Sequence, residues 1–349
     1  MSRKLKVGIA GAGWPGQAHA RGYEAAGGFE VVAVADLIPE RRKALLSQWP
    51  EAREFAGYDQ MIQQCELDVV SVCLPTALHA EAVVASLKAG RHVLCETPPV
   101  LHAGQLRAMS RTAQRTGRLV QFAFQRRFGA AEQAARQALS KGYAGTPYHV
   151  RAAWMRTRSI PRGTGWYTDR AQSGGGAIAD LGVHLLDLGR LLLDQPAAVT
   201  AFAVSHQRFR SLVPDTDRYD VDDATFALVR FANGATLELA TAWAINQPPS
   251  QSGTLLRVHG DAGAIDVYTS SGPVLWRGFD GKSEPKSTVL PQPRLAGHAA
   301  MARHLRTAIE GKASPSASLE EAASIMHLLD ALRQSAQSGR SVPVKQWKA

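Results

Sequence analysis

The chain has 349 residues, of which 45% are hydrophobic and 20% charged, with a formal net charge of +10. This composition is typical of a folded globular protein, and the length favours two domains. The basic residues are dispersed rather than gathered in a stripe, so the charge does not predict nucleic-acid binding. Neither a signal peptide nor a membrane-spanning segment is predicted, and we expect a cytoplasmic protein whose cysteines are reduced thiols.

The N-terminal segment predicts a dinucleotide-binding turn. A short apolar strand at residues 6–10 runs directly into a G-x-G-x-x-G motif, after which a helical pattern begins. In such a turn Gly11 allows the tight bend, Gly13 lets the backbone approach a pyrophosphate, and Gly16 lets the helix pack closely on the strand. The free N–H groups at the helix N-terminus then face the phosphates. The turn consists of Gly11, Ala12, Gly13, Trp14, Pro15 and Gly16.

A carboxylate follows the second predicted strand, residues 30–35. Asp36 lies about 20 residues after Gly16, where an acidic side chain binds the ribose hydroxyls of a dinucleotide. A carboxylate there repels the 2′-phosphate of NADP, whereas Arg41 and Arg42 follow closely enough to bind one. The sequence therefore favours NAD as the cofactor, with NADP as the alternative.

Strand and helix patterns alternate through residues 1–124. This alternation predicts a doubly wound parallel sheet of the Rossmann type, with helices on both faces. Further strands are expected at 68–73, 92–95 and 119–122, and helices at 77–89 and 102–116.

From residue 125 to 349 the pattern predicts a second α/β domain. A helix at 129–141 and an extended segment at 148–156 precede a polar loop, and residues 174–194 are strongly helical. Alternating runs then predict a large, mostly antiparallel sheet, before helices at 298–310 and 319–337 close the chain. The runs lie at 199–206, 225–231, 235–242, 254–259 and 264–268.

Polar groups that follow the strands of the first domain are candidate ligand contacts, because a doubly wound sheet binds ligands outside the carboxyl ends of its strands. These candidates are Leu74, Pro75, Thr76, Glu96, Thr97, Pro98 and Gln125.

A second candidate site lies in the helical segment at 174–194. Asp180, His184 and Asp187 recur at helical spacing and share one face. A histidine beside a carboxylate can donate and accept protons near neutral pH, although a buried polar pair of purely structural role has the same pattern. No third ligand of the usual kind lies near Asp180 and His184, so no metal site is predicted.

Together these motifs resemble the glucose–fructose oxidoreductase/inositol dehydrogenase/rhizopine catabolism (Gfo/Idh/MocA) family. The resemblance runs along essentially the whole chain. It is carried by the glycine turn, Leu74-Pro75-Thr76 with His79, the segment from Gly90 to Pro98, the segment from Gly174 to Asp187, Asp222-Asp223-Ala224, and Phe231-Ala232-Asn233-Gly234.

The resemblance implies hydride transfer between NAD(P) and a hydroxyl carbon of a sugar, cyclitol or related polyol. It also implies that His184 exchanges the hydroxyl proton, that Asp180 orients the substrate or His184, and that the open sheet of the second domain pairs subunits into a homodimer or homotetramer. The residues that it places in the cofactor cleft are Thr76, His79, Glu96 and Pro98, and Trp166 matches a loop that approaches the cofactor or substrate.

One position departs from the family. The family usually has Glu-Lys-Pro where this chain has Glu96-Thr97-Pro98, and the lysine stabilises charge on the reacting oxygen. Thr97 can donate a hydrogen bond but carries no charge. Three functions therefore stay open: a dehydrogenase, a lyase or hydrolase that recycles bound NAD within each turnover, and a cofactor-binding regulator.

The substrate-binding candidates are polar and basic. Trp166 and Tyr167 lie in the loop before the second site, and the arginines near it suit a carboxylate or phosphate on an acidic substrate or simply form a solvated surface. The arginines suited to such an anionic group are Arg156, Arg158, Arg162, Arg208 and Arg210. Arg126, Arg158 and Arg162 are the substrate contacts that can also supply the charge that Thr97 lacks.

Overall fold

The computed structural model describes residues 3–161 and 165–347, which form two units. The first unit runs to Phe128 and includes Leu295–Ala323, and the second consists of Gly129–Arg294 and the chain from Ser324. The sequence pattern placed everything after residue 124 in the second domain. The structure groups Leu295–Ala323 with the first unit because helix α9 (Gly297–Ile309) packs along α1 (Trp14–Ala26).

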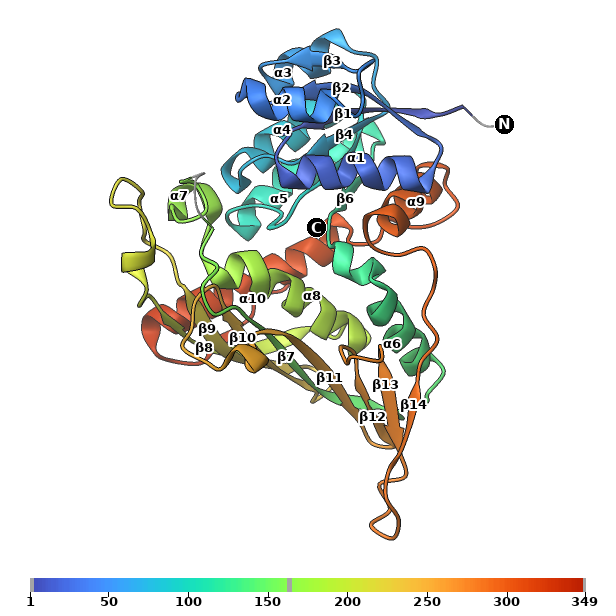
Figure 1. Cartoon of the computed structure of the whole chain (residues 1–349), viewed down its shortest axis with the longest axis vertical. Coiled ribbons are helices and arrows are strands. Elements are labelled where there is room, and N and C mark those ends of the chain that lie inside the picture. The colour runs from blue at the N-terminus through green and yellow to red at the C-terminus, as the bar shows by residue number, and fades with distance from the viewer. Residues whose placement is uncertain (1–2, 162–164, 348–349) are drawn as a thin grey trace. The chain divides into compact units, whose positions relative to one another are not determined.

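The first unit is built on a six-stranded parallel sheet in the order β3-β2-β1-β4-β5-β6 (Figure 1). Its strands are β1 (Leu5–Ala10), β2 (Phe29–Ala35), β3 (Arg53–Phe55), β4 (Val69–Val72), β5 (His92–Cys95) and β6 (Val120–Phe122). The order reverses direction between β1 and β4, which is where a doubly wound sheet binds its ligand.

Helices cover both faces of this sheet, because crossovers that lead away from β1 in opposite directions place their helices on opposite faces. Helices α1 and α9 pack together, and α4 pairs with α5. The remaining helices of the unit are α2 (Pro39–Leu46), α3 (Tyr58–Gln64), α4 (Thr76–Lys88) and α5 (Leu106–Thr116), with short 3₁₀ turns at Ala103–Gln105 and Gln125–Phe128. Met301 and Leu305 of α9 are fully buried in a core shared with Tyr23 of α1.

The second unit is built on a nine-stranded sheet in the order β14-β13-β12-β11-β7-β10-β9-β8-β15. All neighbours are antiparallel except β7 and β10. The predicted fold class is therefore confirmed, although the last short strands were not foreseen. The strands are β7 (Pro147–Met155), β8 (Ala198–His206), β9 (Ala224–Phe231), β10 (Thr236–Ala242), β11 (Gly253–Gly260), β12 (Gly263–Asp266), β13 (Val274–Arg277), β14 (Lys286–Val289) and β15 (Val342–Pro343).

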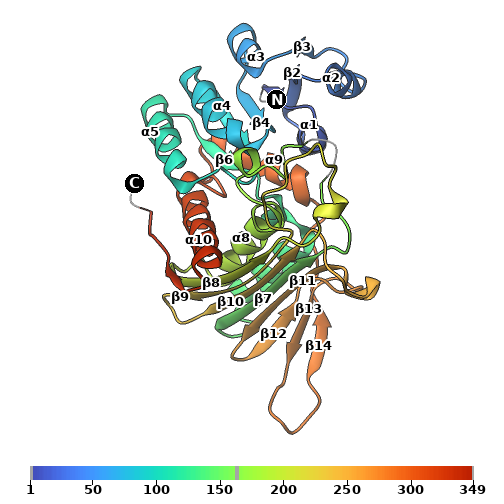
Figure 2. The same ribbon diagram turned by 90° about the vertical axis from the view of Figure 1, so that its left-hand side faces the viewer.

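One face of the large sheet carries helices α6 (Ala130–Ser140), α8 (Val183–Leu192) and α10 (Leu319–Ser338), as Figures 1 and 2 show. The short helix α7 (Arg170–Ser173) precedes α8. No helix of the described ranges covers the opposite face, where large apolar side chains are exposed on β8 and β9. They are Phe202, Val204, Phe226 and Leu228.

All three cysteines, Cys65, Cys73 and Cys95, are buried and free of disulfides. Burial raises the pKa of the Cys73 and Cys95 thiols. Within residues 3–161 and 165–347, no helix has both the length and the apolar character needed to cross a bilayer.

Candidate active site

The turn between β1 and α1 needs glycine at two positions and leaves open space at a third. Gly11 has a φ of 97°, and a Cβ there would lie 2.2 Å from the carbonyl oxygen of Cys73. A Cβ at Gly16 would lie 2.0 Å from the carbonyl oxygen of Gly11, so helix and strand could not approach as closely with any other residue. At Gly13 the nearest atom, in Pro15, would be 3.8 Å away. The space beside Gly13 is therefore free for a ligand.

The carboxylate of Asp36 lies beside this turn. Its Oδ2 accepts a hydrogen bond from the N–H of Ala12 at 2.8 Å, and its Oδ1 accepts one from the N–H of Ile38 at 2.8 Å. The guanidinium of Arg42 donates to the Asp36 carbonyl at 2.6 Å and to Glu54 at 3.1 Å. Arg42 is thus already bonded within the protein.

His79 joins two loops at the carboxyl edge of the sheet. Its Nε2 lies 2.8 Å from the carbonyl oxygen of Leu74, and its Nδ1 lies 2.9 Å from that of Pro98. Burial lowers the pKa of His79. Because its two ring nitrogens face backbone carbonyls of different loops, the buried side chain of His79 connects the loop after β4 to the loop after β5.

Two buried polar atoms near the same edge have no hydrogen-bond partner among the described residues. They are Oγ1 of Thr76, at the start of α4, and Oε1 of Gln125, in the 3₁₀ turn after β6. Buried polar groups are normally hydrogen-bonded, so both oxygens are suited to pair with a bound ligand or water. Together with the open space at Gly13, they fit the sugar and amide groups of a bound dinucleotide.

The loop after β5 is fixed by the side chain of Glu96. Its Oε2 accepts the N–H of Thr97 at 2.9 Å, and its Oε1 lies 3.0 Å from Nε2 of His19. The following peptide bond, between Thr97 and Pro98, is cis.

In the second unit, the glycine-rich segment before α8 is held by Asp222. Its carboxylate accepts the N–H groups of Gly176 and Ile178, both at 2.9 Å. A Cβ at Gly176 would lie 1.7 Å from the carbonyl oxygen of Asp222, so the segment can lie against Asp222 only with glycine at this position. Asp169 caps α7 by accepting the N–H of Ala171 at 2.9 Å.

The segment predicted as one helix contains a π-helical turn at Ile178–Gly182, which leads into α8. Such wide turns within helices frequently occur at functional sites. Asp180 lies in this turn, and its Oδ2 accepts a hydrogen bond from Nε1 of Trp243 at 2.7 Å. Trp243 directly follows β10 and is fully buried. The orientation of Asp180 therefore depends on a residue distant in sequence.

His184 and Asp187 follow on α8 and are both buried. His184 is 8% exposed. The centroid of its ring lies 6.3 Å from that of the Trp154 ring, and the two ring planes are tilted by 47°. The guanidinium of Arg156 lies 5.1 Å from the centroid of Trp154. His184 thus has an aromatic neighbour on β7.

The residues predicted to contact the substrate differ in their surroundings. The rings of Trp166 and Tyr167 stack with centroids 3.8 Å apart. Arg158 bonds Asn246 at 2.5 Å and lies over the ring of Phe209, so it has a role within the fold. Arg126 lies half-buried in the 3₁₀ turn after β6. Arg162 lies outside the described residues.

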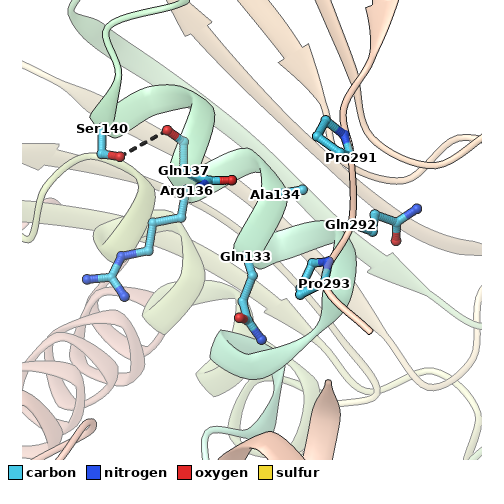
Figure 3. Close-up of a pocket in the computed structure, with 8 residues that line it drawn as sticks. All are labelled: Gln133, Ala134, Arg136, Gln137, Ser140, Pro291, Gln292 and Pro293. Carbon is cyan, nitrogen blue, oxygen red and sulfur yellow. Dashed lines mark hydrogen bonds between the residues drawn. The ribbon is translucent and has the colours of Figure 1, made fainter. Parts of the chain in front are cut away.

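A pocket of about 620 Å³ in the second unit contains none of the predicted site residues (Figure 3). It lies between α6 and the segment that follows β14, and Oγ of Ser140 donates to the carbonyl of Gln137 at 2.9 Å on its α6 side. Its lining consists of Gln133, Ala134, Arg136, Gln137, Ser140, Pro291, Gln292 and Pro293.

Three residues near the predicted site residues were not identified from the sequence, namely Trp243, His19 and His298. Trp243 has no local signal, since its partner Asp180 lies in another element. His19 lies on α1, and His298 lies on α9, the segment whose place in the first unit was not foreseen. Burial, together with the nearby His19, lowers the pKa of His298 to about 4, so His298 is neutral at neutral pH.

Models of the two domains of one protein family match the two parts of the chain. Residues 5–124 match the oxidoreductase family with an NAD-binding Rossmann fold, and residues 133–266 match the GFO/IDH/MocA C-terminal domain. The D-glucoside 3-dehydrogenase of Escherichia coli (strain K12) is 32% identical over 98% of each chain. The inositol 2-dehydrogenase of Rhizobium meliloti (strain 1021) is 27% identical over 75% of this chain and 74% of its own.

Solved structures have the same fold. GenD2 from gentamicin A biosynthesis, in complex with NAD, is 25% identical with a TM-score of 0.82, covering 99% of this chain and 97% of its own. A levoglucosan dehydrogenase in complex with NADH has a TM-score of 0.86 at 21% identity, covering 99% of this chain and 100% of its own.

Proposed function

Because the chain belongs to the Gfo/Idh/MocA family of oxidoreductases, we propose that it transfers hydride between NAD and a hydroxyl-bearing carbon of a sugar, cyclitol or related polyol. The observation that carries the proposal is the similarity to a D-glucoside 3-dehydrogenase along nearly the whole of both chains. The bound nicotinamide would supply the hydride acceptor, and the protein would supply binding, orientation and proton exchange.

The residues of the first unit would hold the cofactor by backbone and neutral polar groups. The N–H groups at the start of α1 suit a pyrophosphate beside Gly13. Asp36 suits the ribose hydroxyls, and the engagement of Arg42 with Glu54 supports NAD rather than NADP. The unpartnered oxygens of Thr76 and Gln125 offer further polar contacts.

In the second unit His184 would exchange the hydroxyl proton of the substrate. As the substrate carbon loses hydride to the nicotinamide, the hydroxyl proton would pass to the imidazole of His184. Asp180, whose carboxylate is oriented by Trp243, would position the substrate or His184. The hydroxyl of Thr97 would hydrogen-bond the reacting oxygen without the charge that a lysine supplies.

Substrate recognition would use the stacked pair Trp166 and Tyr167, with Arg126 as a cation for acidic substituents. Arg158 is a weaker candidate for substrate binding, since it is bonded to Asn246 and lies over Phe209.

Assembly into homo-oligomers would use the uncovered face of the nine-stranded sheet. Phe202 pairs with Leu228, and Val204 with Phe226, so the four side chains form one apolar patch across β8 and β9. Leu228→Glu should therefore shift the protein to a smaller species in size-exclusion chromatography with light scattering. Phe279→Glu, an exposed residue outside this patch, is the control and should leave the assembly unchanged.

The activity is tested by incubating the purified protein with NAD and a panel of D-glucosides, other sugars and cyclitols, while absorbance and products are both recorded. NADH formed in proportion to oxidised product would support the dehydrogenase. A transformed glycoside with no net NADH would instead indicate a lyase or hydrolase that recycles its cofactor. Cofactor binding without any turnover would indicate a regulator.

A further inference from the structure

Three side chains of metal-ligating types converge in the first unit. They are His19 on α1, Glu96 after β5 and His298 on α9, and one ligand atom from each lies within 4.8 Å of the others. All three belong to the same unit, since α9 returns to it from the end of the chain. The cluster includes none of the residues proposed to exchange protons with the substrate.

The first two ligand candidates already form a buried polar pair. His19 is 1% exposed and Glu96 is 9% exposed, and Nε2 of His19 lies 3.0 Å from Oε1 of Glu96. The other carboxylate oxygen accepts the N–H of Thr97 at 2.9 Å. Glu96 is therefore held in one orientation, with Oε1 directed at the imidazole.

His298 adds an unsatisfied nitrogen to this pair. Its Nε2 is buried and has no hydrogen-bond partner among the described residues. The position of His298 is fixed by helix packing, because a Cβ at Gly22 of α1 would lie 2.8 Å from the Cβ of His298. A buried nitrogen without a partner requires an explanation, and a ligand bound by the neutral imidazole provides one.

Outer hydroxyl groups orient His19. Its Nδ1 lies 3.3 Å from Oγ of Ser71, which lies 2.7 Å from the hydroxyl of Tyr23. A hydroxyl can donate or accept, so Ser71 can hydrogen-bond Nδ1 of His19 whether or not that nitrogen carries the proton. A hydrogen bond of this kind to the second ring nitrogen is typical of histidines that bind metals.

We propose that His19, Glu96 and His298 form a binding site for a divalent transition-metal ion, with zinc as the ion that the donor set favours. Two imidazole nitrogens and one carboxylate oxygen are donors that zinc accepts, and three protein ligands leave a fourth position open. With Nε2 of His19 bound to the ion, the single ring proton would lie on Nδ1, which faces Oγ of Ser71. Because Glu96 directly precedes Thr97, the ion would bring positive charge next to the position that lacks a lysine.

The test uses the full chain, stripped of metal with a chelator and then desalted. Zinc chloride is titrated by calorimetry, and cobalt chloride is titrated by absorbance, which reports the coordination number. We expect one high-affinity zinc per chain and a four-coordinate cobalt spectrum. His298→Ala should weaken zinc binding at least about 100-fold, since even the loss of an outer-shell partner costs up to that much.

The matched control is His304→Ala on the same helix, whose ring bonds Ser314 and Ser316 instead. Its zinc affinity should equal that of the unaltered chain. Glu96→Gln provides a second variant that keeps the acceptor for the Thr97 N–H but removes the charged ligand, and it should also lose the cobalt spectrum.

The proposal is overturned if the unaltered chain lacks a stoichiometric zinc site, or if His298→Ala binds zinc as well as the unaltered chain. Zinc should also raise the melting temperature of the unaltered chain and of His304→Ala, but not that of His298→Ala. These measurements need neither NAD nor a substrate, so they do not depend on the proposed oxidoreductase activity.

Discussion

The carboxyl edge of the first sheet and the helix that carries His184 are built by different means. At the first sheet, the turn from Gly11 to Gly16 is marked by a local glycine motif, and its glycines lie against backbone carbonyls of Cys73 and Gly11. In the second unit, Asp180 is oriented by Trp243 and the glycine segment by Asp222, both of which come from distant parts of the chain. A dinucleotide turn can therefore be identified locally, whereas a site for proton exchange depends on the assembled unit.

The largest expected effect comes from the proton-exchanging residue itself. His184→Asn should lower kcat by about 10²–10⁴-fold, because a neutral amide cannot exchange the proton, while NAD affinity stays nearly unchanged. Steady-state kinetics and NADH fluorescence titration give the two values. An equal loss of turnover and of cofactor affinity would contradict the assignment.

The same Gly→Ala substitution at two positions of the glycine turn should have different effects. Gly16→Ala should lower the free energy of unfolding by about 1–3 kcal/mol or more, since its Cβ would lie 2.0 Å from the Gly11 carbonyl. Gly13→Ala should leave stability within about 0.5 kcal/mol, because its Cβ enters open space. Its NAD affinity should instead fall about tenfold or more. Denaturant unfolding measures the stability of each variant, and cofactor titration measures its NAD affinity. An unchanged NAD affinity in Gly13→Ala would mean that the pyrophosphate binds elsewhere.

The dependence of the second site on distant residues is tested at Trp243. Trp243→Phe removes the donor to Asp180 and should cost about 1–3 kcal/mol of stability, with kcat reduced about tenfold. Trp276→Phe is the matched control, since the indole of Trp276 donates to Asp266 at 3.1 Å in the same sheet. It should affect stability but not kcat. If both variants lower kcat alike, Trp243 contributes only to stability.

The smallest effect is expected in the choice of cofactor. Asp36→Ala removes the carboxylate that repels a 2′-phosphate and should narrow the preference for NAD over NADP by about tenfold. The ratio of kcat/KM for the two cofactors measures this preference. An unchanged ratio would mean that the ribose is recognised by other residues.

Local patterns predicted much of the fold, for physical reasons that particular elements illustrate. The buried strands β1 and β4 consist mostly of apolar residues, and Gly11 and Gly16 after β1 mark a turn that side chains would block. The alternating strands of the second unit were equally clear. By contrast, β14 is short and polar, so its sequence resembles a loop, and it pairs only because β13 lies beside it.

The amino-acid sequence by itself determined the order of the main strands and helices, the glycine motif of the dinucleotide turn and the carboxylate that follows β2, because each is recognised from residues close together in the chain. Only the tertiary structure decided that α9 belongs to the first unit, that Arg158 is occupied within the fold, and that Trp243 orients Asp180. It also brought His298 to His19 and Glu96. These contacts join residues far apart in sequence, and their geometry follows from how the helices and sheets pack rather than from any local pattern.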